Sequence, residues 1–294
     1  MNILITGGSG LIGSVWIPML LRANHRVFLL SRSRRTSGAN TNLIPLVWDG
    51  KKIPLEEPVD AVVNLAGAPL ADHRWTASYK EEIIQSRIYA TKACVEFLSK
   101  TGNPQTVFVS ASAVGYYGTH QEGILTEESP SGNDFLANTA VLWEKEALQA
   151  SVRTVLLRLG VVLSKDGGAF PKILTPFKLY AGGQVGNGKQ GFPWIHILDV
   201  LSALEFCIQN QAISGPVNAV APESTSNKQF SEQLAAALNR PTFITIPEFM
   251  VELALGEASM LVTQGQLVTP AVLLKNNFIF HYSTLKSALN ELLA

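Results

Sequence analysis

The sequence predicts an α/β fold, in which helices cover both faces of a mostly parallel β-sheet. Three observations predict it. Short apolar runs mostly alternate with helical patterns through the first half of the chain, and no internal repeat is present. In addition, 47% of the 294 residues are hydrophobic and only 16% are charged, as in a well-buried globular protein. Strands that alternate with helices are typical of a parallel sheet.

The expected elements of the first half follow one another closely. In chain order they are strand 3–6, helix 11–23, strands 25–31, 43–48 and 59–65, helix 76–100, strand 105–110, helix 134–150 and strand 154–162. This order predicts a doubly wound sheet whose ligands lie at the carboxyl ends of the strands. We expect residues 1–165 to form this domain.

The second half of the chain differs from the first in composition and in its predicted elements. Residues 166–193 are rich in glycine and proline, which predicts a loop over a site or a lid. Helical patterns follow at 198–210, 227–238, 248–255 and 283–293. We expect residues 194–220 to return to the first domain, and residues 221–294 to form, with the 166–193 loop, a small and mostly helical C-terminal domain.

A glycine-rich segment stands between the first strand and the first helix. Gly7, Gly10 and Gly13 occur in Thr-Gly-Gly-Ser-Gly-Leu-Ile-Gly, the pattern of a pyrophosphate loop. Glycines let the backbone approach the phosphates, and the helix that begins at Leu11 and Ile12 offers free N–H groups to an anion. The alternative is a merely structural turn. In this position the pattern predicts a Rossmann-type dinucleotide site.

The end of the second strand indicates which dinucleotide binds. An NAD site usually carries Asp or Glu there, to accept from the ribose 2′-hydroxyl. This strand instead ends in Ser31 and Arg32, which can donate to the 2′-phosphate of NADP. Arg34 and Arg35 fit a solvated basic turn. We therefore expect NADP(H) as the cofactor.

Composition and charge make several other classes of protein poor candidates. The formal net charge is zero, which argues against a partner that is nucleic acid or an anionic membrane. We expect no transmembrane segment, no signal peptide and a cytoplasmic location. Cys94 and Cys207 lie in apolar helical patterns and are expected to be reduced core thiols, and no metal-ligand spacing is present.

Beyond the glycine loop, further motifs resemble one family. They are Asn64–Gly67, Ser86-Arg87, the segment 110–118 (Ser-Ala-Ser-Ala-Val-Gly-Tyr-Tyr-Gly), the segment 158–163 (Arg-Leu-Gly-Val-Val-Leu), Asp166–Gly168, Gly182-Gly183, Trp194–Asp199, Pro247, Leu255–Glu257, Gln266 and Pro270. Together they resemble the atypical extended short-chain dehydrogenase/reductases called epimerase family proteins (bacterial YfcH-like), over essentially the whole chain. The resemblance implies NADP(H) contacts beyond the loop. The predicted cofactor-binding residues are Gly7, Gly10, Leu11, Ile12, Gly13, Ser31, Arg32, Leu65, Ala66, Gly67, Arg87, Ser110 and Val162.

The catalytic prediction is less direct. In the superfamily a Tyr-x-x-x-Lys pair lies on the helix after the fifth strand, where the lysine lowers the tyrosine pKa so that the phenol can exchange a proton with substrate. Here that helix, expected over 134–150, has no tyrosine, and its first lysine is Lys145. The candidates that remain are Ser112, which matches the substrate-orienting serine of the superfamily, and Tyr116 or Tyr117, for which packing under the loop is the favoured alternative.

Two other matches are expected to be structural. Tyr282 and Lys286 have the Tyr-x-x-x-Lys spacing but lie near the C-terminus, outside the expected sheet. His196 is expected to support the C-terminal domain, and Asp199 to cap the helix that follows it.

Two functions from different classes stay open. One is an NADP(H)-dependent oxidoreductase or epimerase that acts on a small polar substrate, favoured by the cofactor site and the long second half. The other is a non-catalytic NADP(H)-binding redox sensor or protein-interaction module, favoured by the absence of the Tyr-x-x-x-Lys pair.

Overall fold

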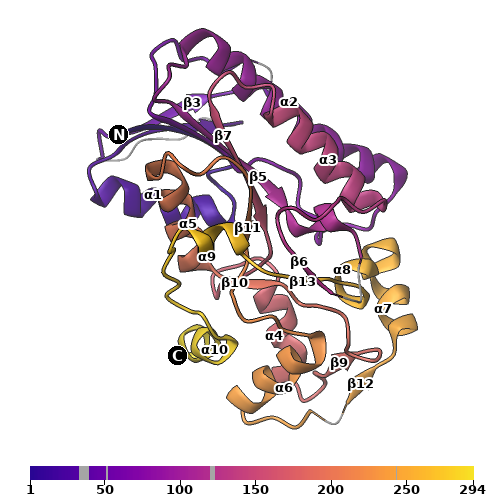
Figure 1. Ribbon diagram of the computed structural model, residues 1–294. Coiled ribbons are helices and arrows are strands. Elements are labelled where there is room, and N and C mark those ends of the chain that lie inside the picture. Colours follow the sequence, from indigo (N-terminus) through magenta and orange to yellow (C-terminus); the bar gives the residue numbers. More distant parts are fainter. Residues whose placement is uncertain (33–39, 51, 120–122, 243) are drawn as a thin grey trace.

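A seven-stranded parallel sheet forms the centre of the computed structural model, which describes residues 1–294 except 33–39, 51, 120–122 and 243 (Figure 1). From one edge to the other, its strands are β11 (Gly215–Ala219), β7 (Arg153–Leu159), β5 (Val107–Ala113), β4 (Ala61–Asn64), β1 (Asn2–Thr6), β2 (Arg26–Ser31) and β3 (Leu43–Val47). All pairs are parallel. The predicted Rossmann-type fold is therefore confirmed.

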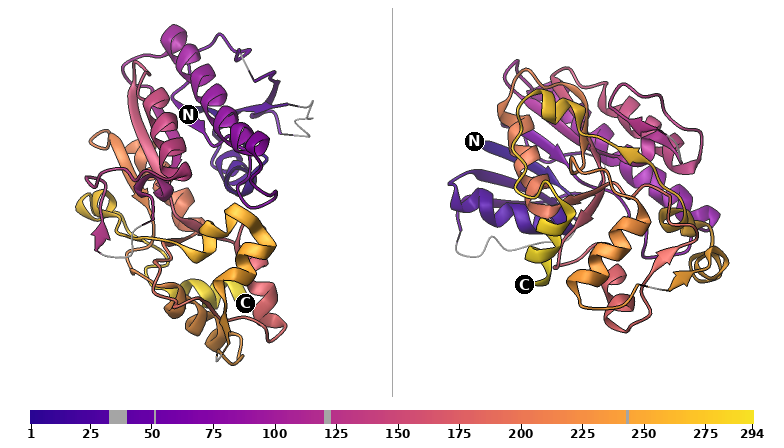
Figure 2. Two further views of the ribbon diagram at one scale, coloured as in Figure 1. Left: turned by 90° about the vertical axis from the view of Figure 1, so that its right-hand side faces the viewer. Right: turned by 60° about the horizontal axis from the view of Figure 1, so that its bottom comes forward.

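Helices cover both faces of this sheet (Figures 1 and 2). Helices α1 (Leu11–Arg22) and α5 (Ile197–Gln209) pack on one face, around Trp16, Ile17 and Leu204. Helices α2 (Ala77–Thr101) and α3 (Phe135–Ala147) cover the other, around Cys94, Phe97 and Ala147. Because both faces are buried, the central strands are apolar on both sides, as their sequences indicated.

The strand order reverses between β1 and β4, although all strands remain parallel. From β1 the order runs outward to β2 and β3 on one side, and through β4 and β5 to β7 on the other. Thr6 pairs with Asn64 at this point. In open parallel sheets, ligands bind at the carboxyl ends of the strands where the order reverses.

The predicted strand 154–162 is divided in two. After β7 ends at Leu159, β8 (Val161–Leu163) leaves the sheet and pairs with β10 (Trp194–His196). Gly160 permits the break, since a Cβ there would overlap the carbonyl oxygen of Pro193. The outer edge of β7 pairs with β11, a strand that we did not predict.

The predicted loop 166–193 also contains regular structure. It includes helix α4 (Phe170–Lys178), with Pro171 at its start, and strand β9 (Gln184–Val185), which pairs with β12 (Thr245–Ile246). Below the sheet in Figure 1, α4 lies with α6 (Asn227–Ala237) and α10 (Leu285–Leu293) around Phe170, Phe177 and Phe230.

The C-terminal segment returns to the first half of the chain. Its remaining elements are α7 (Glu248–Leu255), η2 (Gly256–Ser259), α8 (Met260–Thr263), β13 (Leu267–Val268) and α9 (Ala271–Lys275). Strand β13 pairs with β6 (Ile124–Leu125), which follows the 3-10 turn η1 (Val114–Tyr117). The C-terminal elements therefore lie beside the loops that leave the carboxyl ends of the strands.

Asp199 does not cap α5, contrary to prediction. The N-cap residue is His196, whose Nδ1 accepts a hydrogen bond from Leu198 N, and its Nε2 lies 2.9 Å from Glu291 Oε2. The buried carboxylate of Asp199 instead accepts hydrogen bonds from the backbone N–H groups of His281 and Tyr282. Because Asp199 already lies inside the first turn, its side chain is free to hold the C-terminal segment against α5. Tyr282, from the second Tyr-x-x-x-Lys match, packs on the His196 ring.

Candidate functional site

The glycine loop is shaped by close backbone contacts. Gly7 has φ of +66°, and a Cβ there would lie 2.5 Å from the carbonyl carbon and oxygen of Leu65. Gly13 faces Gly8 so closely that a Cβ would overlap its backbone, and this contact sets α1 tightly against the loop. Only glycine fits these positions, so the loop brings β1, β4 and α1 together at one point.

The N-terminus of α1 opens at this point. Gly10 is its N-cap residue and offers no side-chain cap, and the first turn contains no acidic side chain. The N–H groups of that turn are therefore available to an anion, and the helix dipole favours one. Leu11 and Ile12 are partly buried there, and Leu11 lies against Gly167 and Gly168 of the segment after β8.

A buried hydrogen-bond network fixes the end of β4. Thr6 Oγ1 donates to Asn64 Oδ1 over 2.6 Å, Asn64 Nδ2 donates to Thr91 Oγ1, and Ala66 N donates to Thr6 Oγ1. Leu65 and Ala66 are held partly buried at the edge of the sheet, and Gly67 is exposed. These hydrogen bonds place Leu65, Ala66 and Gly67, which we predicted to bind the cofactor, directly beside the glycine loop.

Arg87 is a partly buried cation without a carboxylate partner among the described residues. Its Nη1 donates to Ile83 O over 2.9 Å, its guanidinium faces the Trp143 ring, and it lies against Gly67. Burial lowers the pKa of Arg87 to about 10. A desolvated cation that no protein anion neutralises suits the binding of an anionic ligand.

Four other residues complete the set that we predicted to bind the cofactor. Ser31 ends β2, the exposed Arg32 follows it directly, and Arg34 and Arg35 lie outside the described residues. Ser110 is buried on β5, opposite Asn64. Val162 lies on β8, and its carbonyl oxygen is near Gly168. The structure thus brings the predicted cofactor residues to the carboxyl edges of β1, β2, β4 and β5 and to β8.

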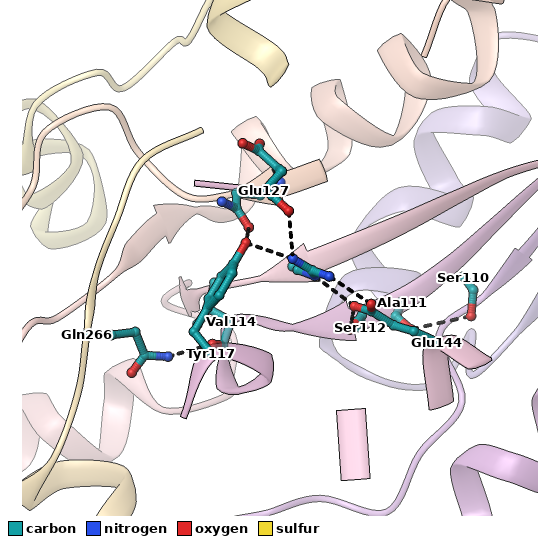
Figure 3. Close-up of polar contacts among 10 residues, drawn as sticks. Ser110, Ala111, Ser112, Val114, Tyr117, Glu127, Glu144 and Gln266 are labelled. Atoms are coloured by element: carbon teal, nitrogen blue, oxygen red, sulfur yellow. Dashed lines mark hydrogen bonds and ion pairs between the residues drawn. The ribbon is translucent and has the colours of Figure 1, made fainter. Parts of the chain in front are cut away.

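Next to this edge, a buried ion pair joins β7 to α3 (Figure 3). Arg158 is 3% exposed and binds Glu144 through two hydrogen bonds, Nε to Oε1 at 2.8 Å and Nη2 to Oε2 at 2.9 Å. Glu144 Oε1 also accepts from Ser112 Oγ at 2.6 Å. Burial alone would lower the pKa of Arg158, but its bonds to Glu144 and Tyr117 outweigh burial and raise it.

The two tyrosines of η1 differ in what they contact. Tyr117 is fully buried: its hydroxyl donates to Asn218 Oδ1 at 2.6 Å and accepts from Arg158 Nη1 at 2.9 Å. Burial raises the pKa of Tyr117, and Arg158 offsets only part of that effect. Tyr116 is partly exposed, with its ring centroid 3.5 Å from the Arg158 guanidinium carbon.

We did not predict Glu144, Glu127 or Asn218 as part of this site. Glu127 Oε1 accepts from the backbone N–H groups of Asn218 and Val272, and the Glu127 carbonyl accepts from Arg158. Arg158 belongs to a motif that we used for the family resemblance, but nothing in the sequence pairs it with Glu144. One signal in the sequence could have identified Glu144. The helical periodicity of residues 134–150 places this charged residue on the core-facing side of the helix.

The loop after β4 is tied to the second half of the chain. Lys172 Nζ on α4 lies 2.6 Å from Asp72 Oδ1, and Arg74 Nη2 donates to the carbonyl oxygens of Leu253 and Ala254. Lys80 binds Glu257 at 2.6 Å. Within the described part of the chain, no cluster of His, Cys, Asp and Glu could hold a metal ion. Both cysteines are buried and free, and burial raises the pKa of each thiol to about 12.

The profile of the NAD dependent epimerase/dehydratase family matches residues 3–219, and that of a domain of unknown function, DUF1731, matches residues 246–292. The chain belongs to the NAD dependent epimerase/dehydratase family. Epimerase family protein YfhF of Bacillus subtilis is 39% identical, over 100% of this chain and 98% of its own. The human epimerase family protein SDR39U1 is 34% identical over the whole of both chains. The resemblance predicted from the motifs is confirmed.

Solved structures of this family share the architecture. A crystal structure of human epimerase family protein SDR39U1 (isoform 2) with NADPH superposes with a TM-score of 0.90, at 33% identity over 99% of each chain. A nucleoside-diphosphate sugar epimerase of Corynebacterium glutamicum gives 0.81 at 33% identity, over 100% of this chain and 58% of that one. More distantly, MoeE5 in complex with UDP-glucose and NAD shares the fold at 19% identity, with a TM-score of 0.78.

Among the described residues, no helix is both long and apolar enough to cross a bilayer.

Proposed function

We propose that this epimerase-family protein is an NADP(H)-dependent oxidoreductase or epimerase that acts on a small polar substrate carrying a hydroxyl group. The observation that carries the cofactor half of this proposal is the contact of Gly7 with Leu65, beside the uncapped N-terminus of α1. A Cβ at Gly7 would overlap the Leu65 backbone, so glycine at this position keeps the loop in the shape that leaves the N–H groups of α1 open to a pyrophosphate. The residues present therefore fit a dinucleotide.

Each part of the cofactor has residues suited to it. The first turn of α1, from Gly10 to Gly13, would hold the pyrophosphate, and Arg87 would add a positive charge. Leu65, Ala66 and Gly67 would line the adenosine, and Ser110 and Val162 would border the nicotinamide. When bound, the nicotinamide would accept or supply a hydride.

NADP(H) is preferred over NAD(H) for two reasons. Arg32 directly follows β2 without an acid beside it in the sequence, so a 2′-phosphate would meet a cation and not a carboxylate. The human relative was crystallised with NADPH, and its chain aligns with almost all of this one. The cytoplasmic location predicted above remains a prediction.

The experiment that tests this function has two steps. NADPH and NADH are first titrated against the purified chain by fluorescence, where we expect NADPH to bind at least ten times more tightly. Bound NADP⁺ or NADPH is then offered a panel of sugar nucleotides, free sugars, small alcohols and ketones, and the absorbance at 340 nm is followed. Tight binding with no turnover across the panel would contradict the enzymatic proposal.

The second candidate, a non-catalytic NADP(H)-binding protein, is favoured by one specific feature. Helix α3 contains no tyrosine, and its first turn presents Leu136, which packs against Gly115. A cofactor-dependent protein partner, recovered with NADPH and lost without it, is the outcome that would select this candidate.

A further inference from the structure

The hydroxyl groups near the end of β5 differ in where their protons go. Ser112 Oγ donates its single proton to Glu144 Oε1 over 2.6 Å, and Tyr117 donates its own to Asn218 Oδ1. A hydroxyl has one proton and two lone pairs. Ser112 can therefore offer only lone pairs to a ligand, so it binds a hydrogen-bond donor such as an alcohol.

Ser112 lies at the edge of the sheet where the cofactor is proposed to bind. It follows Ser110 by two residues on β5, and it pairs with Arg158 on β7. The Ser112 side chain is buried, but the chain immediately beyond it is not: Ala113, Gly115 and Tyr116 are all partly exposed. The relay proposed below requires a small ligand at this edge to reach the side of Ser112 opposite Glu144.

The carboxylate behind Ser112 is held in one orientation. Both oxygens of Glu144 accept hydrogen bonds from Arg158, and the Ser112 proton completes the set on Oε1. Arg158 is in turn fixed by Tyr117 and by the stacked Tyr116 ring. A charged, bidentate contact of this kind is rigid as well as strong. Glu144, held in place by Arg158, therefore fixes the orientation of the Ser112 hydroxyl.

We propose that Ser112 and Glu144 form a proton relay that performs the acid–base role of the missing tyrosine–lysine pair. In this proposal Ser112 contacts the substrate and is the catalytic residue, and Glu144 accepts the relayed proton only transiently, because the buried Arg158 charge needs an ionised partner. Arg158 is a positioning residue. The relay rests on the proposed function, because it requires a bound nicotinamide dinucleotide as the hydride acceptor.

Oxidation of an alcohol through this relay transfers one hydride and two protons. The hydrogen on the carbinol carbon leaves with its electron pair to the oxidised nicotinamide, and the carbon–oxygen bond becomes a carbonyl. The hydroxyl proton of the substrate passes to Ser112 Oγ as the serine proton passes to Glu144 Oε1. Reduction of the carbonyl uses the same path in reverse, with Glu144 supplying the proton.

Tyr116 is the competing candidate for the same role. Its hydroxyl has no hydrogen bond to any described residue, and its ring is partly exposed. A substrate could therefore reach it without passing Ser112. The relay and the Tyr116 alternative make opposite predictions for two small substitutions, Ser112→Ala and Tyr116→Phe.

The test compares these two variants with a matched control. Thr139→Val removes another buried hydroxyl, on α3 itself, where Thr139 Oγ1 donates only to Phe135 O. NADPH affinity, turnover at 340 nm and the solvent isotope effect in mixtures of H₂O and D₂O are measured for each protein. The probe substrate is the first compound of the panel above that wild-type protein converts.

The relay predicts a loss of turnover of at least about 100-fold in Ser112→Ala. Turnover should change less than threefold in Tyr116→Phe and Thr139→Val, with NADPH affinity within twofold in all three. Two protons move together in the relay, so the wild-type rate should depend on the deuterium fraction along a curve and not a line. If Ser112 were merely structural, the dependence of the rate on the deuterium fraction would be the same in Ser112→Ala as in wild type.

Each contrary result has a distinct meaning. Turnover in Ser112→Ala within tenfold of wild type overturns the relay, and a loss in Tyr116→Phe at the same time assigns the role to Tyr116. A linear isotope dependence in wild type also overturns it. Wild-type protein that binds NADPH but converts no compound overturns the proposed function, and the relay falls with it. Protein that binds no NADPH contradicts the cofactor assignment itself.

Discussion

Arg158 and Glu144 are both buried, and they face each other through two parallel N–H···O contacts of 2.8 and 2.9 Å. The pair ties the last major strand before the sheet edge to the helix that covers it. Burying a charge is costly unless it is paired, so each partner depends on the other. The pair also positions Ser112, which makes it both a stability element and part of the candidate site.

Replacing one member of this pair should destabilise the fold strongly. Arg158→Met leaves a buried carboxylate with only Ser112 as a donor, and the free energy of unfolding should fall by about 3–5 kcal/mol. The double variant Arg158→Met, Glu144→Met removes both charges and should recover most of that loss. Urea denaturation of the two variants measures the difference. Equal loss in the single and double variants would show that shape, and not the uncompensated charge, dominates.

Gly7 and Gly50 provide a matched pair of glycines. Both have positive φ, +66° and +87°, but a Cβ at Gly50 would meet nothing within 4 Å, whereas a Cβ at Gly7 would lie 2.5 Å from the Leu65 backbone. Gly50→Ala should cost only the backbone strain, about 1–2 kcal/mol, and leave NADPH affinity unchanged. Gly7→Ala should cost more and abolish NADPH binding. Thermal melts and fluorescence titration of both variants test this, and intact NADPH binding in Gly7→Ala would contradict the proposed role of the glycine loop in binding the pyrophosphate.

How far the sequence predicts this molecule is clear at particular residues. The glycine loop and the end of β2 follow local rules, because a turn that needs glycine and a basic residue directly after a strand can be recognised within a few residues. The break at Gly160 was missed because the cause is the carbonyl of Pro193, distant in the sequence. The capping role of Asp199 was wrong for a similar reason, since its partners His281 and Tyr282 are some eighty residues away.

The acid–base cluster is also a product of the tertiary fold. Ser112 was predicted from its place in a motif, but the acceptor of its proton is Glu144, which lies 32 residues further along the chain. Strand register then brings Arg158 opposite Ser112. No periodicity in the sequence encodes these pairings, so the site could be located from the sequence while its internal hydrogen bonds could not.

Arg32 should determine the preference between the two dinucleotides. In Arg32→Ala, NADPH affinity should fall about tenfold, equivalent to about 1.4 kcal/mol, because a charge-assisted contact to the 2′-phosphate is lost. NADH affinity should not change. The control is Arg22→Ala, which removes an exposed cation from the last turn of α1. Fluorescence titration with both dinucleotides measures the ratio; a parallel loss of NADPH and NADH binding in Arg32→Ala would contradict a role in discrimination.

Unlike Arg158, Arg87 should contribute little to the stability of the fold and much to NADPH affinity. Since burial lowers the pKa of Arg87 to about 10 and no described carboxylate neutralises it, Arg87→Met should change the free energy of unfolding by less than about 1 kcal/mol. NADPH affinity should nevertheless fall by about tenfold, as a phosphate contact is lost. Lys92→Met, an exposed lysine on the same helix, is the control. Unchanged NADPH affinity in Arg87→Met would remove Arg87 from the cofactor site.

His196 should make the folded state sensitive to mild acid. Burial is the largest influence and lowers the pKa of His196 below the usual 6.5, against the opposing pull of Glu291 and Asp199, while His281 acts with burial. The unfolded chain therefore binds the proton more readily, so stability is present above about pH 6.5 and declines as the pH falls towards the folded-state value. The structural reason is that Nδ1 accepts from Leu198 N, and a proton on Nδ1 abolishes that cap.

Thermal melts between about pH 7.5 and pH 5.5 measure this effect, within the range where an ordinary histidine titrates. The melting temperature of wild-type protein should fall on acidification, and His196→Asn should show a shallower fall. His25 also has a lowered pKa, chiefly from burial and then from the N-terminal ammonium, and it contributes in the same direction. His25→Asn is therefore the second variant. If His196→Asn leaves the fall in melting temperature as steep as in wild type, the α5 cap is not a group that senses acid; a profile flattened more in His196→Asn than in His25→Asn assigns most of the sensitivity to the contact of His196 with Leu198.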